Sequence, residues 1–340
     1  MIIQRSRCLA WTDVVMAVIF PKPLLAPRMS TPMIPVPNAC PMQGTAPLPH
    51  LGVIRVQGDD AAKFLHGQLT QDFSLLGLSE ARLAGFCSAK GRLLASFIGF
   101  KRAHDDILLV CSADLLHTTL KRLSLFVLRA KARLSDASAE FQLCGLAANA
   151  VPAGLPEAPW SRVDSDGAQV VRLYPGAGVE RALWVAPVGA APAPGEHLGA
   201  EAWRWLDVMS GVATLSQPVV EAFVPQMINF ESVGGVSFKK GCYPGQEVVA
   251  RSQFRGTLKR RAYVAQCPVS MVSGQEVFHD SDPTQPCGTV VEGAQNPSKG
   301  WNAIVSLQIT SVEAGVLHLG AADGPAVGLM SLPYPLLADV

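Results

Sequence analysis

Hydrophobic and polar positions recur in regular patterns from about Leu51 onward, and these patterns predict the first ordered elements. The run 51–58 alternates in polarity as a strand does. After it, apolar residues recur with helical spacing and predict a helix that starts at Asp59 or Asp60 as cap and runs to about Phe73. The apolar face of this helix is formed by Ala61, Phe64, Leu65 and Leu69.

A hairpin is indicated farther along, where the strand-like runs 82–88 and 92–100 are joined by Ser-Ala-Lys-Gly. A strand at 107–111 and an amphipathic helix from Ser112 to Lys131 follow. The helix turns eight residues inward: Leu115, Leu116, Thr119, Leu120, Leu123, Phe126, Val127 and Ala130. Because strands and helices do not alternate regularly, the pattern predicts an α+β fold with antiparallel sheets.

A second group of strands is predicted at 140–145, 169–173 and 183–188, and a short helix at Ala200–Met209 ends before Gly211. Trp203 and Trp205 lie two positions apart on this helix, so they point in different directions. We therefore expect one of them to meet a cleft or another domain.

The C-terminal third contains short β-rich runs broken by Gly, Pro, Asn and Asp at intervals of about ten residues, a pattern typical of a small barrel or sandwich. These runs are 262–267, 276–278, 288–291, 303–307 and 316–319. We expect a region of two interleaved α+β subdomains at 48–253 and a β-barrel domain at 254–335.

The first 47 residues differ from the rest, since nine prolines between Pro21 and Pro49 prevent a continuous helix or sheet. This composition predicts a disordered tail, or an upstream extension of a protein that starts at Met29, Met33 or Met42. A targeting peptide is the alternative, but Asp13 interrupts the apolar stretch and no small-residue cleavage site follows.

Composition narrows the classes of function. A formal net charge of +1 in 340 residues gives no general attraction to nucleic acid or membrane. The eight cysteines show no C-x-x-C or Cys/His ligand spacing, so the sequence predicts neither a zinc site nor a self-contained iron–sulfur cluster. Dispersed cysteines fit a reducing compartment, and we expect a cytoplasmic protein without a membrane segment.

The segment 238–261 is the densest in groups that can do chemistry. Cys242 follows Lys239 and Lys240, whose charges favour a thiolate, so a reactive or ligating sulfur is one interpretation. The alternative is a small buried Cys242 beside solvated lysines. Pro244 and the following GQEVVAR predict a helical first turn with Glu247 near its positive end.

Four stretches carry a resemblance to a known family: GGVSFKKGCYPGQEVVAR from Gly234 to Arg251, with GQLTQD at 67–72, AKGR at 89–92 and VPQMIN at 224–229. Together they resemble the YgfZ family, the folate-binding relatives of the glycine-cleavage T-protein, over about residues 48–335. The motif residues are Lys239, Lys240, Gly241, Cys242, Tyr243, Gly245, Gln246 and Glu247.

The resemblance implies a three-part molecule whose central cleft holds tetrahydrofolate or a one-carbon derivative. It also implies a role in iron–sulfur cluster assembly or repair, with client or assembly proteins as partners and an indirect link to tRNA modification. Cys242 would be the functional thiol.

The resemblance also suggests folate contacts. Trp203 stands where the family has a tryptophan at its folate site, whereas a second family tryptophan appears here as Leu51. A core position for Trp203 is the alternative, since large aromatic residues are usually buried. Arg92, Lys240 and Arg251 are candidates for binding the negatively charged folate tail.

The sequence leaves open whether the protein is an enzyme. Related aminomethyltransferases carry an Asp pair in the hairpin where this chain has Leu94 and Ala95, so the acid needed for one-carbon transfer is missing. Asp72 is another carboxylate, but its position favours local bonds to the backbone. The alternatives are therefore a tetrahydrofolate-dependent aminomethyl or formyl transferase and a non-catalytic RNA or protein scaffold, in which Lys259, Arg260 and Arg261 would bind phosphates.

Overall fold

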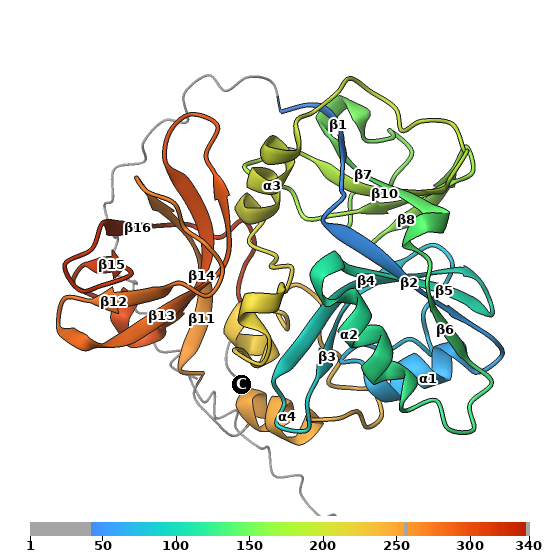
Figure 1. Cartoon of the computed structure of the whole chain (residues 1–340), viewed down its shortest axis with the longest axis horizontal. Coiled ribbons are helices and arrows are strands. Elements are labelled where there is room, and N and C mark those ends of the chain that lie inside the picture. The colour runs from blue at the N-terminus through green and yellow to red at the C-terminus, as the bar shows by residue number, and fades with distance from the viewer. Residues whose placement is uncertain (1–41, 255–257, 338–340) are drawn as a thin grey trace, which may run out of the picture. The chain divides into compact units, whose positions relative to one another are not determined.

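The computed structural model describes residues 42–254 and 258–337, and β-sheets dominate this part of the chain (Figure 1). One antiparallel sheet has the strand order β3-β4-β5-β2-β6. Its strands are β2 (Leu51–Gln57), β3 (Ala81–Cys87), β4 (Leu93–Ala103), β5 (Asp106–Ser112) and β6 (Arg133–Asp136). The predicted hairpin is confirmed: Ser88 N–H donates to the Arg92 carbonyl at 2.8 Å, and Gly91 has a φ of +70° that suits the turn.

A second antiparallel sheet has the order β1-β7-β10-β9-β8. Its strands are β1 (Gly44–Pro47), β7 (Phe141–Ala147), β8 (Arg162–Ser165), β9 (Ala168–Arg172) and β10 (Arg181–Pro187). The prediction of a disordered tail up to residue 47 is wrong for Gly44–Pro47, which pairs with β7. Pro47 is tolerated because β1 is an edge strand. The prediction for residues 1–41 lies outside the described residues.

The first two helices begin as predicted but end early. Helix α1 (Ala61–Gln68) stops before Phe73, because Thr70 leaves the helix to donate its N–H to the Gly85 carbonyl and its hydroxyl to the Gly235 carbonyl. Helix α2 (Ala113–Ser124) stops before Lys131. The chain must turn there, since Lys131 N–H donates to the Asp60 carboxylate at 2.8 Å and the Lys131 carbonyl accepts from Asp60 N–H.

The early end of α2 leaves part of its predicted apolar face in solvent. The side chain of Phe126 is 44% exposed, although the helical spacing predicted that it points inward. Leu115, Leu116, Thr119 and Leu123, which lie within α2, are buried as predicted.

Helix α3 (Ala200–Met209) matches its predicted bounds, and Gly211 follows with a φ of +67°. Both tryptophans are buried, in different directions. Trp203 packs on β7, where a Cβ on Gly145 would come within 2.4 Å of its ring. Trp205 donates its Nε1–H to Asn302 Oδ1 on the barrel at 2.8 Å, so α3 packs between the second sheet and the barrel (Figure 1).

Helix α4 (Gln246–Phe254) begins after Pro244 and Gly245, not at Pro244, because Gly245 has a φ of +79° that is not helical. Gln226 donates to the Val249 carbonyl at 2.7 Å and thereby holds α4 in place. The short 3-10 helices are η1 (Ser138–Glu140), η2 (Ala148–Ala150), η3 (Gln217–Val219), η4 (Pro225–Ile228) and η5 (Ile309–Val312).

The C-terminal strands form a closed antiparallel barrel in the order β11-β14-β13-β12-β15-β16. Its strands are β11 (Arg260–Cys267), β12 (Glu276–His279), β13 (Asp282–Gln295), β14 (Trp301–Gln308), β15 (Leu317–Leu319) and β16 (Ala326–Met330). The barrel prediction is thus confirmed, but β16, which closes the barrel against β11, was missed. Of the two proposed architectures, closure favours the barrel over the sandwich because no open edge remains.

A search of the described helices for a membrane span found none that is long and apolar enough.

Candidate functional site

The loop that carries Cys242 presents its sulfur to solvent. Cys242 is exposed, whereas Cys87, Cys111, Cys267 and Cys287 are buried. The alternative interpretation of Cys242 as a small buried residue is therefore wrong. An accessible thiol is the first requirement for a reactive cysteine.

Lys240 fastens this loop to α1. Its ammonium is buried, donates to the His66 carbonyl at 2.6 Å and to the Gly241 carbonyl at 3.2 Å, and lies 4.4 Å from the centroid of the Tyr243 ring. Burial lowers the pKa of Lys240 to about 8, although the charges of Asp72 and Cys242 act in the opposite direction. In this position the ammonium stabilises the loop.

A histidine and a carboxylate lie beside the same loop. His66 Nδ1 is 3.0 Å from Asp72 Oδ1, which also accepts from Leu75 N–H at 3.0 Å. Burial acts to raise the pKa of Asp72, but the hydrogen bonds from Leu75 and His66 outweigh it and lower the pKa below its ordinary value. The predicted local bonding of Asp72 is confirmed, and the pairing with His66 was not anticipated.

The remaining motif segments come together at this loop. Gln71 donates to the Gly234 carbonyl at 2.6 Å, which ties GQLTQD to the GGVS stretch. A Cβ on Gly245 would lie 2.4 Å from the Ser88 carbonyl oxygen, and a Cβ on Gly91 would lie 2.7 Å from Val248 Cβ. The hairpin turn at 88–91 and the loop at 241–245 therefore fit together only with glycine at the contacts.

Two of the predicted tail-binding residues have partners elsewhere. Arg92 donates to the Ala222 carbonyl at 2.6 Å and is half-buried. Arg251 is exposed and pairs with Glu247 at 2.5 Å, one helical turn away. Tail binding by Arg92, Lys240 and Arg251 stays a prediction.

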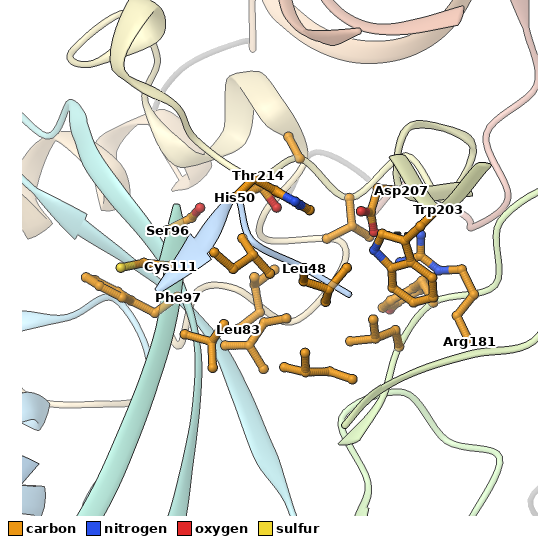
Figure 2. A pocket seen from close by; sticks show the side chains of 18 of the residues that line it. Leu48, His50, Leu83, Ser96, Phe97, Cys111, Arg181, Trp203, Asp207 and Thr214 are labelled. Atoms are coloured by element: carbon orange, nitrogen blue, oxygen red, sulfur yellow. Dashed lines mark hydrogen bonds and ion pairs between the residues drawn. The ribbon is translucent and has the colours of Figure 1, made fainter. Parts of the chain in front are cut away.

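A separate cavity of about 50 Å³ lies between the first sheet and α3 (Figure 2). Apolar side chains from both sheets, from α3 and from the segments that connect them form most of its wall. Its described lining includes Trp203 and Leu51, the position of the missing second tryptophan, but not Cys242, Arg92, Lys240 or Arg251. The structure thus does not bring the predicted site residues together around one cavity.

The polar end of the cavity is built from residues that the motifs did not reveal. Arg181 pairs with Asp207 at 2.8 Å, and its guanidinium carbon lies 4.9 Å from the centroid of the Trp203 ring (Figure 2). Two residues of the cavity lining, His50 and Arg181, each carry a buried nitrogen, Nδ1 and Nε respectively, that lacks a hydrogen-bond partner among the described residues. Such groups are costly when unpaired, so a polar ligand at this end would stabilise them.

Burial sets the charge states at this end. It lowers the pKa of His50, against the opposing effect of Asp207, so His50 is neutral near pH 7. Burial also raises the pKa of Asp207, while the positive charge of Arg181, and that of His50 once it is protonated at lower pH, oppose this rise. Beside them, Glu292 on β13 accepts from Thr214 N–H at 3.0 Å, and burial together with the charge of Asp207 raises its pKa to about 8.

Two residues at the polar end of the cavity could have been found from the sequence. Asp207 lies four positions after Trp203, on the same face of α3. Arg181 is a charged residue in a strand that is otherwise apolar. His50 and Glu292 carried no such signal, because only the fold brings His50 to the cavity and Glu292 close to Asp207.

The hairpin supplies no acid for one-carbon transfer, and two of the three basic residues proposed to bind RNA are held by other groups of the protein. Leu94 and Ala95 are buried in β4 and do not line the cavity, whose only carboxylate among the described lining residues is Asp207. Of the three basic residues proposed for RNA, Arg261 is buried against Glu231 and Arg260 donates to the Cys287 carbonyl. Within residues 42–254 and 258–337, no cluster of three or more His, Cys, Asp or Glu side chains could hold a metal ion.

Comparisons with known proteins give relatives over most of the chain. A search of family models found no match. The chain is 32% identical over 218 residues to the tRNA-modifying protein YgfZ of Cronobacter sakazakii, covering 60% of this chain and 65% of that protein, or just under two thirds of its length. It is 31% identical over 298 residues to the tRNA-modifying protein YgfZ of Klebsiella pneumoniae, covering 83% of this chain and 90% of that protein.

Among solved structures, the fold is similar to that of the glycine cleavage system aminomethyltransferase T of Bartonella henselae. The TM-score is 0.63 at 17% identity, with 86% of each chain covered. The α+β fold with a C-terminal barrel is therefore a T-protein-like fold, as predicted.

Proposed function

The chain belongs to the YgfZ family, and from that premise we propose that it is a folate-binding accessory protein of iron–sulfur cluster assembly or repair, linked to tRNA modification. Cys242 is its functional thiol. The observation that carries the folate part is the cavity beside Trp203, whose polar end has two buried nitrogens without partners. Family membership, the names of the relatives as tRNA-modifying proteins and the exposed Cys242 support the rest.

The cavity residues fit a reduced folate in chemical type. A pterin needs an apolar wall and a few polar groups that complement its edge. Leu48, Leu83 and Val110 supply the wall. His50 Nδ1 can donate or accept according to its tautomer, and Arg181 Nε–H donates. Trp203 is only 1% exposed and rests on Gly145, so it closes the inner end and is not a free stacking face.

In this proposal the cavity binds the folate, and the loop around Cys242 presents the thiol. In the cavity, the apolar wall excludes water while neutral His50 and the Arg181–Asp207 pair orient the polar edge of the ligand. When bound, a reduced folate supplies a carrier for one-carbon units. At the motif loop, Lys240 holds Cys242 at the surface, where a protein partner can reach the sulfur.

This arrangement disfavours aminomethyl transfer. Leu94 and Ala95 give no acid, and Asp207, the one carboxylate of the described lining, is held by Arg181 at 2.8 Å. A transfer reaction would need a carboxylate free to stabilise developing positive charge. We expect no turnover with a lipoyl-linked aminomethyl donor and tetrahydrofolate, and ammonia release in that assay would favour the transferase instead.

Two variants test the proposal in one experiment. Cys242→Ser should abolish the function in cells, measured as the activity of iron–sulfur enzymes and the level of modified tRNA, and leave tetrahydrofolate affinity in calorimetry unchanged. His50→Leu should weaken tetrahydrofolate binding by about tenfold, since it removes one hydrogen bond to a buried group.

Cys144→Ser is the matched control, because Cys144 is a half-buried cysteine on β7 that lines neither place. It should behave as wild type in both measurements. Normal iron–sulfur enzyme activity with Cys242→Ser would remove the thiol from the proposal, and absence of tetrahydrofolate binding to the wild-type chain would remove the folate.

A further inference from the structure

We propose that a groove beside α2 binds an acidic amphipathic helix of a partner protein. The groove has a volume of about 520 Å³ and is formed by α2 together with residues of β3, β4 and the segment after η3. Its described lining shares no residue with the cavity beside Trp203 and does not include Cys242. The inference therefore goes beyond the proposed function and does not depend on it.

The wall of the groove is apolar. Its apolar side chains come from two strands, one connecting segment and the helix: Phe86, Leu94, Val220, Leu115, Leu125 and Phe126. The polar side chains of the described lining are two threonines and two cations of α2. A concave apolar surface of this size has room for several apolar side chains of a ligand.

Two apolar side chains at the C-terminal end of α2 lie in water at the edge of this groove. The side chain of Leu125 is 69% exposed and that of Phe126 is 44% exposed. Helix α2 ends at Ser124 because the chain turns to bring Lys131 to Asp60, and the turn leaves both side chains without a hydrophobic cover. An apolar patch of this kind beside a concave surface is typical of a binding site, since a partner removes it from water.

The position of α2 on the sheet leaves space for a second helix. It packs mainly on β2, β5 and β6, so the groove lies beside it, against Phe86 of β3 and Leu94 of β4. A helix that binds in a groove inserts apolar side chains that recur every three or four residues. A partner segment of about twelve residues matches the length of α2, which is roughly 18 Å.

The charged side chains of the groove are cationic. Lys121 and Arg122 belong to its described lining, are exposed and have no ion-pair partner among the described residues. The one carboxylate of α2, on Asp114, lies at the opposite end, where it accepts from the Ser112 hydroxyl and from Gln217 N–H. Carboxylates beside the apolar face of an occupant would pair with both cations, whereas a basic occupant would be repelled.

Charge and shape favour a partner helix over other occupants. Residues 1–41 of the chain carry four lysines and arginines and one aspartate, so their charge has the same sign as that of the groove. A membrane surface is flat, and a helix that lies on it presents protruding apolar side chains and not a hollow. Cations in the last turn also stabilise α2 itself, but this role does not account for the exposed Leu125 and Phe126.

The test measures peptide binding to the full chain by fluorescence anisotropy. The probe is a labelled helical peptide of about 16 residues, made of leucine at every third or fourth position with alanine and glutamate between. A second peptide carries lysine at each glutamate position. We expect the glutamate peptide to bind at least tenfold more tightly than the lysine peptide, and to bind more weakly as the salt concentration rises.

Variants locate the binding in the groove. Leu125→Ser and Phe126→Ser should each weaken binding of the glutamate peptide about tenfold, because each removes an apolar side chain that the peptide covers. Leu125 is the more exposed of the two and serves if Phe126→Ser does not fold. The double change Lys121→Glu and Arg122→Glu should reverse the preference, so that the lysine peptide binds more tightly.

Matched controls change the same residue types on other surfaces. Val188→Ser alters an exposed valine just after β10, and Lys299→Glu alters an exposed lysine in the barrel. Both should bind the glutamate peptide as wild type does.

Four results would overturn the inference. They are no binding of the glutamate peptide, equal binding in the wild type and the groove variants, stronger binding to phosphatidylglycerol vesicles that Phe126→Ser abolishes, and a dimer in sedimentation that Phe126→Ser dissociates. The last two would assign the groove to a lipid surface or to a second copy of the chain. None of the four changes the expected effects of Cys242→Ser and His50→Leu, so failure here is distinct from failure of the proposed function.

Discussion

Glu292, on the barrel strand β13, gives a quantitative test of how a buried carboxyl group near Asp207 makes the stability of the fold depend on pH. Its half-buried carboxyl group on β13 accepts from Thr214 N–H at 3.0 Å and faces the charge of Asp207. We expect Glu292→Gln to stabilise the protein above neutral pH, since glutamine keeps an acceptor oxygen for Thr214 and carries no charge.

The size of the effect follows from the pKa of Glu292, which is raised from 4.5 to about 8 by burial and then by Asp207. A carboxyl group with a raised pKa contributes stability that is complete below pH 4.5 and is lost as the pH rises through 8. At about 1.4 kcal/mol per pKa unit, the loss is roughly 3 kcal/mol at pH 7 and levels off near 5 kcal/mol above pH 8. Each 1 kcal/mol of stabilisation would raise the Tm by roughly 2 °C in a chain of this size.

The assay is thermal unfolding of wild type and Glu292→Gln from pH 5 to pH 9. The Tm difference should be near zero at pH 5, grow through pH 7 and become constant above pH 8. Glu276→Gln on the exposed face of β12 is the control and should leave the Tm unchanged at every pH. A variant that is less stable than wild type at pH 8, or a difference that does not change with pH, would refute the reasoning.

Two further predictions concern the cavity wall. Gly145→Ala should destabilise the fold by about 1–3 kcal/mol in urea titration, since its Cβ would come within 2.4 Å of the Trp203 ring, whereas Gly154→Ala has no heavy atom within 4 Å and should be neutral. His50→Gln should flatten the decline of stability from pH 7 to pH 5: burial lowers the pKa of His50, so its contribution is present above pH 6.5 and is lost as the pH falls through the folded value.

Local pattern predicted those parts of the fold that depend on local forces. The bounds of α3 and the hairpin at Ser88–Gly91 follow from periodicity and turn chemistry. The ends of α1 and α2 do not, because Thr70 and Lys131 leave the helical path for partners that are far away in the sequence. Strand β1 was missed for the same reason, since only pairing with β7 makes its short, proline-containing segment a strand.

The same distinction holds for the candidate site: the sequence identified residues that are contiguous in the chain and missed those that only the fold brings together. The motif identified Cys242 and its loop, because those residues are contiguous in the sequence. It could not identify His50, Arg181 or Glu292, because only the fold brings His50 and Arg181 to the cavity and Glu292 close to Asp207. Of the two residues that the resemblance singled out, Trp203 lines the cavity and Cys242 does not.

A crystal structure of the chain soaked with tetrahydrofolate tests the central claim most directly. We predict the pterin in the cavity beside Trp203, with its polar edge within hydrogen-bonding distance of His50 Nδ1 or Arg181 Nε, and Cys242 free of ligand at the surface. A pterin bound at the Cys242 loop, or a cavity without ligand at saturating tetrahydrofolate, would contradict the account.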